Sequence, residues 1–123
     1  IKVDVVLPKV PDTHVYANLV TMNRLLEESH DSLNIYLYPK MTHAKVMLSD
    51  GVIAAVGSAN LTPRSMRTSK EVTLFVHGAP NAAFIRELRE RLEADIAESE
   101  LVLEPFDLSF TDKVQAVVGK YVW

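Results

Sequence analysis

A histidine and a lysine two residues apart begin the part of this sequence whose residue types could do chemistry on a phosphate. His43 and Lys45 are followed by Asp50 and by a Gly-Ser-Ala-Asn run at 57–60. Side chains at i and i+2 of a strand project from one face, so a strand over 43–49 would present the imidazole and the ammonium together. The ammonium supplies fixed positive charge, and the imidazole can act as nucleophile or proton carrier near neutral pH. The pair suits an anionic group, and phosphate is the natural candidate.

The polar groups that follow the pair are expected to fold back beside it. An Asp-Gly pair at 50–51 separates two β-rich runs, 43–49 and 52–56, and predicts an antiparallel hairpin. The returning strand would bring Ser58 and Asn60 near the start of the outgoing one, where their neutral donors could hold phosphate oxygens.

Three further residues are expected to shape this site. Gly57 permits close approach of another backbone segment, and Asp50 would stabilise the turn before Gly51. Glu71 begins the next predicted strand and could hydrogen-bond the remote ring nitrogen of His43, which would fix its tautomer and raise its basicity.

The remaining sequence predicts the elements that position the hairpin. Apolar residues alternate over 3–7, 33–39 and 71–77, which predicts strands, and recur at helical spacing over 15–30 and 81–99. This order predicts an α/β fold, a mixed β-sheet with helices packed on its faces.

Length and composition indicate one compact domain. With 123 residues and 48% hydrophobic content, we expect residues 1–105 to form that domain, and residues 106–123 to form a helical tail packed on it. The chain contains no cysteine, which excludes disulfide and thiolate chemistry. No apolar run is long enough to cross a bilayer, so the chain by itself is expected to be soluble.

The charge distribution argues against a nucleic-acid partner. The formal net charge is -3 and the pI about 5.8, without the basic excess of most nucleic-acid binders. Residues 40–71 carry five cations and two acids, whereas 81–107 carries three arginines and eight acids. The cations therefore gather around the 43–60 motif, where Arg64 and Arg67 could either contact a substrate phosphate or headgroup or lie in a solvated loop.

The motif resembles the signature of the phospholipase D superfamily, H-x-K-x4-D-x6-G-S-x-N, which residues 43–60 match without a gap. The flanking stretches VDVVLPKVPDTHVY and NIYLYPKMTHAKVMLSD look like the second half of bacterial cardiolipin synthases. The resemblance covers about residues 1–99 and implies a phospholipase D-like α-β-α sandwich, present here as a truncated half.

The resemblance also implies a role for each signature residue. His43 either attacks phosphorus to form a phosphohistidine or protonates the leaving alcohol. Lys45 and Asn60 bind the phosphoryl oxygens, while Ser58 and Glu71 support the site. Neither a metal nor another cofactor is implied.

The family pattern needs two such motifs, and this chain contains one. Nucleophile and general acid are separate histidines on opposite sides of the phosphorus. We therefore expect either a second motif in an N-terminal part that precedes Ile1, or two copies of the chain paired about a two-fold axis. The cardiolipin-synthase-like flanks and the start inside a strand pattern favour the first arrangement, and the isolated chain is expected to be inactive as a monomer.

We therefore expect a phosphatidyltransferase that moves a phosphatidyl group between phospholipids such as phosphatidylglycerol. A covalent intermediate makes such transfer possible, since either water or a second alcohol can take the group from it. The full-length protein is expected at a membrane surface, the bacterial inner membrane, with no nucleic-acid partner. One alternative is a homodimeric phosphodiesterase or nuclease of the same superfamily, which the acidic balance disfavours. The other is a degenerate interaction module, disfavoured because no signature residue is missing.

Overall fold

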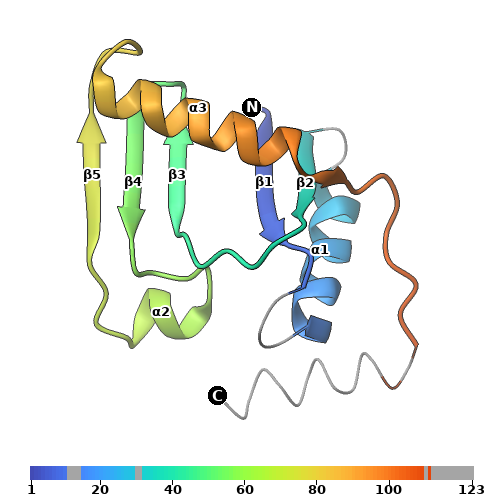
Figure 1. Ribbon diagram of the computed structural model, residues 1–123. Coiled ribbons are helices and arrows are strands. Elements are labelled where there is room, and N and C mark those ends of the chain that lie inside the picture. Colours follow the sequence, from blue (N-terminus) through green and yellow to red (C-terminus); the bar gives the residue numbers. More distant parts are fainter. Residues whose placement is uncertain (11–14, 30–31, 110, 112–123) are drawn as a thin grey trace. The chain divides into compact units, whose positions relative to one another are not determined.

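The computed structural model describes residues 1–10, 15–29, 32–109 and 111. The chain divides into two compact units, one formed by residues 1–42 with 95–123 and the other by residues 43–94. Each unit contains a three-stranded sheet of its own (Figure 1). The predicted α/β class with mixed strand pairing is confirmed, and its strands lie in two sheets.

The first unit contains the mixed sheet, in the order β1-β2-β6. Strands β1 (Val3–Pro8) and β2 (Leu33–Tyr38) are parallel, and β6 (Glu100–Leu101) pairs antiparallel with β2. Helix α1 (Val15–Ser29) lies between β1 and β2 in the chain, because two parallel strands need a long crossover connection. Since β2 has a partner on both sides, it leaves no edge on which β3 could pair.

The core of this unit joins α1 to β2. Met22 of the helix packs with Ile35 and Leu37 of the strand, and all three side chains are buried. The C-terminal segment is tied to the same helix, since the Asn23 side chain donates to the Phe106 carbonyl and accepts from the Phe106 amide, each at 2.7 Å. Most of the predicted tail, 106–123, lies outside the described residues, so its helical form and the proposed domain division stay predictions.

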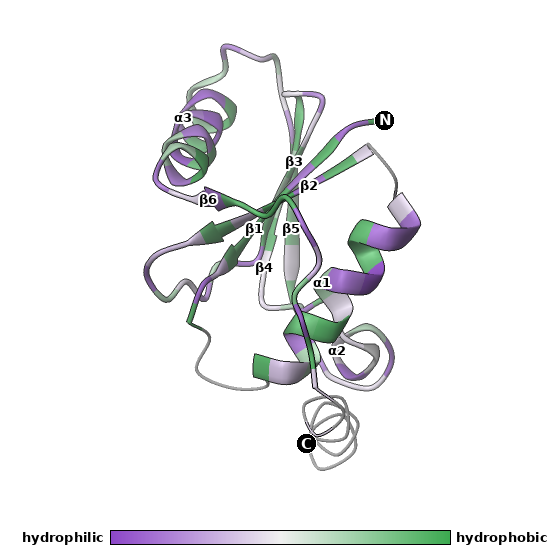
Figure 2. Cartoon of the chain, turned by 90° about the vertical axis from the view of Figure 1, so that its right-hand side faces the viewer, coloured by the Kyte–Doolittle hydropathy of each residue, from purple (hydrophilic) through white to green (hydrophobic). Residues whose placement is uncertain are grey.

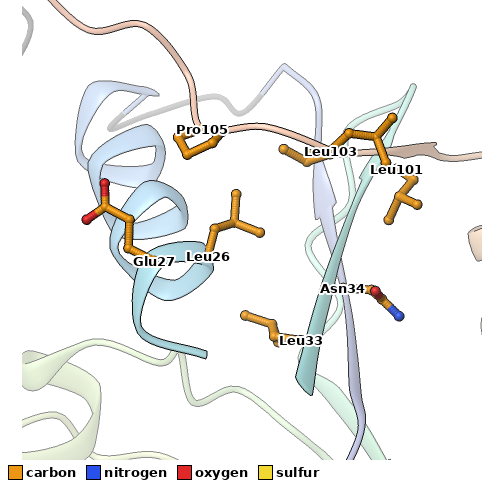
Figure 3. Close-up of a pocket in the computed structure, with 8 residues that line it drawn as sticks. Leu26, Glu27, Leu33, Asn34, Leu101, Leu103 and Pro105 are labelled. Atoms are coloured by element: carbon orange, nitrogen blue, oxygen red, sulfur yellow. The ribbon is translucent and has the colours of Figure 1, made fainter. Parts of the chain in front are cut away.

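A groove of about 440 Å³ opens in the first unit between α1, β2 and the segment after β6. Leu26 and Leu33 lie on one side of it and Leu103 on the other (Figure 3). None of its lining residues belongs to the 43–60 motif, so this groove is separate from the candidate site.

The second unit contains an antiparallel sheet in the order β3-β4-β5, with strands β3 (Val46–Ser49), β4 (Ile53–Gly57) and β5 (Thr73–His77). Helix α2 (Pro63–Arg67) lies in the connection from β4 to β5, and α3 (Ala83–Ala97) follows β5 (Figure 1). Hydrophilic and hydrophobic residues mix along α3, as in an amphipathic helix (Figure 2).

The buried side chain of α3 in this unit is Ile85, one residue from the predicted apolar series that begins at Phe84. Ile85 is fully buried, whereas Phe84 is exposed. The backbone turns just before the helix at Gly78, and Ile85 lies close against that glycine. Ala54 and Ala55 of the central strand complete the buried set of this unit.

The hairpin predicted at the Asp-Gly pair is confirmed. Asp50 and Gly51 have φ values of 52° and 66°, and the Val52 amide donates to the Ser49 carbonyl at 3.0 Å. Two successive left-handed residues are the mark of a type I′ turn, whose twist matches that of the paired strands. Asp adopts this conformation more readily than most residues with a side chain.

Among the described residues, no helix is both long and apolar enough to cross a bilayer.

Candidate active site

All residues of the predicted site lie in the second unit, but the histidine and the lysine precede the strand rather than form part of it. Strand β3 begins at Val46, which corrects the predicted strand start at His43. The pairing with β4 extends by one hydrogen bond beyond the regular ladder, from the Gly57 amide to the Lys45 carbonyl at 3.1 Å. Because β4 ends at Gly57, it offers His43 no further partner, and the alternation of a strand does not determine where the imidazole points.

A direct contact links the lysine and the histidine of the signature. The Lys45 ammonium donates to the His43 carbonyl at 2.8 Å. His43 is exposed and Lys45 is half-buried. The contact uses one of the three donors of the ammonium, so two remain for a ligand.

Gly57 lies where the chain of β5 comes closest. A Cβ atom added at this position would lie 2.4 Å from the Val72 carbonyl oxygen and 2.6 Å from the Thr73 hydroxyl oxygen. Both distances are well inside van der Waals contact, so the structure requires a glycine here. The next residue bonds to the same segment, since the Ser58 amide donates to the Val72 carbonyl at 3.0 Å.

The centre of this region is the carboxylate of Glu71. The Ser58 hydroxyl donates to one of its oxygens at 2.5 Å, and the Ser65 hydroxyl donates to the other at 2.8 Å. The Val72 amide donates to the Ser58 hydroxyl oxygen at 3.1 Å, so Ser58 is held from both sides. Glu71 and Ser65 are half-buried.

These contacts lower the pKa of Glu71 below its ordinary value. The hydrogen bond from Ser58 has the largest effect, followed by the one from Ser65, while partial desolvation acts in the opposite direction. The positive charge of Lys45 adds a smaller lowering of the same pKa. Hydroxyl donors and a nearby cation all stabilise the charged carboxylate, so Glu71 is an anion at neutral pH.

Ser65 is a site residue that the sequence analysis missed. It lies on α2, whose N-cap is Thr62: the Thr62 hydroxyl accepts from the Ser65 amide at 3.2 Å, and Pro63 follows the cap. Thr followed by Pro is a helix-start signal and could have predicted this short helix. No local pattern could have predicted the contact from Ser65, the third residue of this helix, to Glu71.

Comparison with known proteins identifies the family. Residues 1–96 match the family described as "Cardiolipin synthase, PLD-like domain". The chain belongs to this family. It is 30% identical over 126 residues to cardiolipin synthase 1 of Staphylococcus epidermidis, an alignment that covers 97% of the chain and 25% of the relative.

Two other relatives give the same picture. The probable cardiolipin synthase YwiE of Bacillus subtilis is 36% identical over 103 residues, which cover 81% of the chain and 19% of the relative. A cardiolipin synthase of Listeria welshimeri is 32% identical over 100 residues, which cover 80% of the chain and 20% of the relative. The chain thus spans about a quarter or less of the length of these curated relatives.

The predicted bond between Glu71 and the imidazole is not formed in this phospholipase D-like domain. Within the described residues, the oxygens of Glu71 accept from Ser58 and Ser65, and no hydrogen bond joins them to the His43 ring. The β4–β5 pairing brings Ser58 beside Glu71, and the Ser58 hydroxyl donates to one of the carboxylate oxygens.

Ser58 already has a partner for its hydroxyl proton in this structure. A hydroxyl has one proton to donate, and that of Ser58 goes to Glu71. To donate to a phosphate oxygen, as predicted, Ser58 would have to give up this bond. In the present arrangement it supports Glu71 and the start of β5.

The other signature residues lie apart from this network. Asp50 is at the turn end of the β3–β4 hairpin, and the four residues of β3 separate it from Lys45. At about 3.3 Å per strand residue, that is on the order of 15 Å, so Asp50 acts on the turn rather than on a ligand at Lys45. Asn60 is exposed on the connection after β4, and no hydrogen bond among the described residues joins it to His43 or Lys45.

The domain also offers no evident cation site. Within residues 1–10, 15–29, 32–109 and 111, no three acidic or histidine side chains gather where they could hold a metal ion. The motif carries the cation Lys45, and the α2 connection adds Arg64 and Arg67, which are both exposed, while the one acid of that connection, Glu71, is held by serine hydroxyls. What this region can attract is an anion.

Proposed function

We propose that the protein to which this domain belongs is a phosphatidyltransferase of the cardiolipin synthase type. The observation that carries the proposal is the complete signature at 43–60, in a chain whose relatives are named cardiolipin synthases. The β3–β4 hairpin and the hydrogen bond from the Gly57 amide to the Lys45 carbonyl support it, because they hold the two halves of the signature beside one another.

In this proposal, an imidazole nitrogen of His43 attacks the phosphorus of a phospholipid. The bond from phosphorus to the leaving alcohol breaks, a phosphohistidine forms, and the hydroxyl of a second phospholipid then takes the phosphatidyl group from it. His43 is exposed, so a substrate phosphate can reach its ring. The two remaining donors of Lys45, with the amide of Asn60, would hold the non-bridging oxygens as charge builds on them.

A proton donor for the leaving alcohol is needed as well. We propose that a second histidine of the same kind, from another part of the full-length protein, supplies it. His43 could equally be the proton donor while that second histidine is attacked, and either assignment makes both histidines essential.

The test uses the full-length protein with phosphatidylglycerol vesicles and measures transfer by the appearance of cardiolipin. We expect His43→Ala to lower the rate by at least about 10³-fold, because the substitution removes either the nucleophile or the general acid. The matched control is His77→Ala, which removes an exposed imidazole at the end of β5 and should leave the rate within about twofold of the wild type. Cardiolipin formed at the wild-type rate by His43→Ala protein would refute the proposal.

The second candidate is a homodimeric phosphodiesterase or nuclease of the same superfamily, which the presence of one motif in the chain favours. Two copies would then supply the two histidines. Analytical ultracentrifugation of residues 1–123 separates the candidates: a dimer that cleaves a chromogenic phosphodiester in a His43-dependent way supports the nuclease. The net charge of -3 weighs against a polyanionic substrate.

A further inference from the structure

The connection between β4 and β5 exposes both apolar and cationic side chains. Leu61, Met66 and Val72 have exposed fractions of 91%, 57% and 79%. The same residues, 61–72, carry three exposed cations: Arg64, Arg67 and Lys70. We call residues 61–72 the α2 surface.

The cations of the α2 surface are not neutralised by the described part of the chain. Two cations on the other helices pair with neighbouring glutamates, Arg24 with Glu28 and Arg86 with Glu90. None of the three cations of the α2 surface forms an ion pair with a described carboxylate. Three cations and one acid, Glu71, leave the α2 surface at +2 in a chain whose net charge is -3. Glu71 itself is held by serine hydroxyls.

The α2 surface is also fixed in shape before anything binds to it. Its last residue is held by the Ser58 amide, which donates to the Val72 carbonyl at 3.0 Å, and its middle is held by the bond from the Ser65 hydroxyl to Glu71 at 2.8 Å. Arg64 and Arg67 are three residues apart on α2 and therefore share a side of the helix. A surface that is already ordered loses little conformational entropy on binding.

We propose that the α2 surface docks the domain on an anionic phospholipid bilayer. The proposal rests on the function proposed above, because it states how the phospholipid substrate is presented to the site. Exposed apolar side chains interspersed with Lys and Arg are what binds at the boundary of headgroups and acyl chains.

The position of the α2 surface supports this role. The Val72 amide donates to the hydroxyl oxygen of Ser58, a residue of the signature. The Ser58 hydroxyl in turn donates to Glu71. A bilayer held against the α2 surface would place lipid phosphates beside the segment that contains Lys45 and Asn60. The docking contact and the proposed chemistry would then share one side of the second unit.

The experiment measures binding of residues 1–123 to vesicles by cosedimentation at about 0.1 M salt. One set contains phosphatidylcholine only, and the other contains phosphatidylcholine with about one third phosphatidylglycerol. We expect binding to the anionic set and at least tenfold weaker binding to the neutral set. Near an anionic leaflet each Lys or Arg changes the affinity by about fivefold, so the triple variant Arg64→Gln, Arg67→Gln, Lys70→Gln should bind roughly 100-fold more weakly.

Matched controls separate the α2 surface from general charge and apolarity. The variant Lys2→Gln, Arg24→Gln, Arg86→Gln changes the net charge equally but should bind within about threefold of the wild type. For the apolar part, Leu61→Ser with Met66→Ser should weaken binding by roughly tenfold or more. The control for that pair is Val10→Ser with Leu103→Ser, whose side chains are 71% and 83% exposed. All four variants alter exposed side chains, and circular dichroism checks that each is folded.

Two results would overturn the docking proposal: equal binding to both vesicle sets, and loss of binding that is the same in the α2 variants and in their controls. The proposed function is tested separately, with the full-length protein and a short-chain phospholipid dispersed as monomers. There Leu61→Ser with Met66→Ser should retain turnover, because no bilayer is involved, whereas His43→Ala should not. Turnover that survives His43→Ala contradicts the proposed chemistry and leaves the vesicle result to decide on the docking surface.

Discussion

Replacing Gly57 by alanine should destabilise the second unit through one contact. The added Cβ would lie 2.4 Å from the Val72 carbonyl oxygen, 2.6 Å from the Thr73 hydroxyl oxygen and 2.8 Å from the Thr73 Cα. Two of these atoms belong to the backbone, so no rotation of a side chain relieves the clash. The start of β5 must move away from the end of β4.

The size of the effect follows from what that movement breaks. Overpacking of this kind costs about 1–3 kcal/mol. The two hydrogen bonds at this point, from the Gly57 amide to Lys45 and from the Ser58 amide to Val72, contribute about 0.5–1.5 kcal/mol each. Alanine loses less chain entropy than glycine on folding, which returns about 0.4–1 kcal/mol. We therefore expect the free energy of unfolding to fall by about 1–5.6 kcal/mol, a large part of the stability of a small domain.

Urea denaturation of residues 1–123, followed by circular dichroism, measures this change. Gly78→Ala is the matched control, because a Cβ at Gly78 would lie 3.3 Å from the Ala82 Cβ and 3.4 Å from the Ile85 Cγ1, both side-chain atoms. That variant should cost less than about 1 kcal/mol. If Gly57→Ala unfolds at the same urea concentration as Gly78→Ala, the close approach of β5 to Gly57 does not lower the free energy of unfolding as predicted.

Two further predictions concern the carboxylate and the turn. Because its hydrogen bonds lower the pKa of Glu71, the Glu71 network stabilises the fold above the usual carboxyl pKa of about 4.3, and this contribution is lost as the pH falls through the lowered value. Ser65→Ala should raise the pKa of Glu71 in a carbon-detected NMR titration, whereas Ser69→Ala, in the same connection, should not; equal titration curves for the two variants would contradict the network. At the turn, Asp50→Val should lower the free energy of unfolding by about 1–2 kcal/mol, because valine resists the φ of 52°. Asp50→Gly should change it by less than about 0.5 kcal/mol, and a valine variant as stable as the glycine variant would show that the turn conformation has changed.

The longer elements of the fold could be predicted because their apolar residues repeat with a clear period. The helix predicted over 15–30 is α1, and the helix predicted over 81–99 is α3, with ends that differ by about one or two residues. The two-residue β6 and the five-residue α2 are too short for a period to show. Their formation depends on neighbours: β6 forms because β2 offers it an edge.

The candidate site was predicted as a set of residues, but not as a set of contacts. The spacing of the signature identified Lys45 and Gly57 as neighbours, and a backbone hydrogen bond from the Gly57 amide to the Lys45 carbonyl connects them in the structure. The predicted strand, however, began three residues before β3 does. Extended conformation can be predicted from residue types, whereas the end of a strand is determined by the length of its partner.

By itself, the sequence indicated the family, the phosphate chemistry expected of the 43–60 signature, and the turn at Asp50-Gly51. An Asp-Gly pair adopts two left-handed residues wherever the flanking strands allow it, so the hairpin needs no tertiary information. The tertiary structure alone decided which donors Glu71 accepts. A carboxylate takes hydrogen bonds from whichever donors reach it, and only the pairing of β4 with β5, with Ser65 held on the capped α2, brings two hydroxyls to this one.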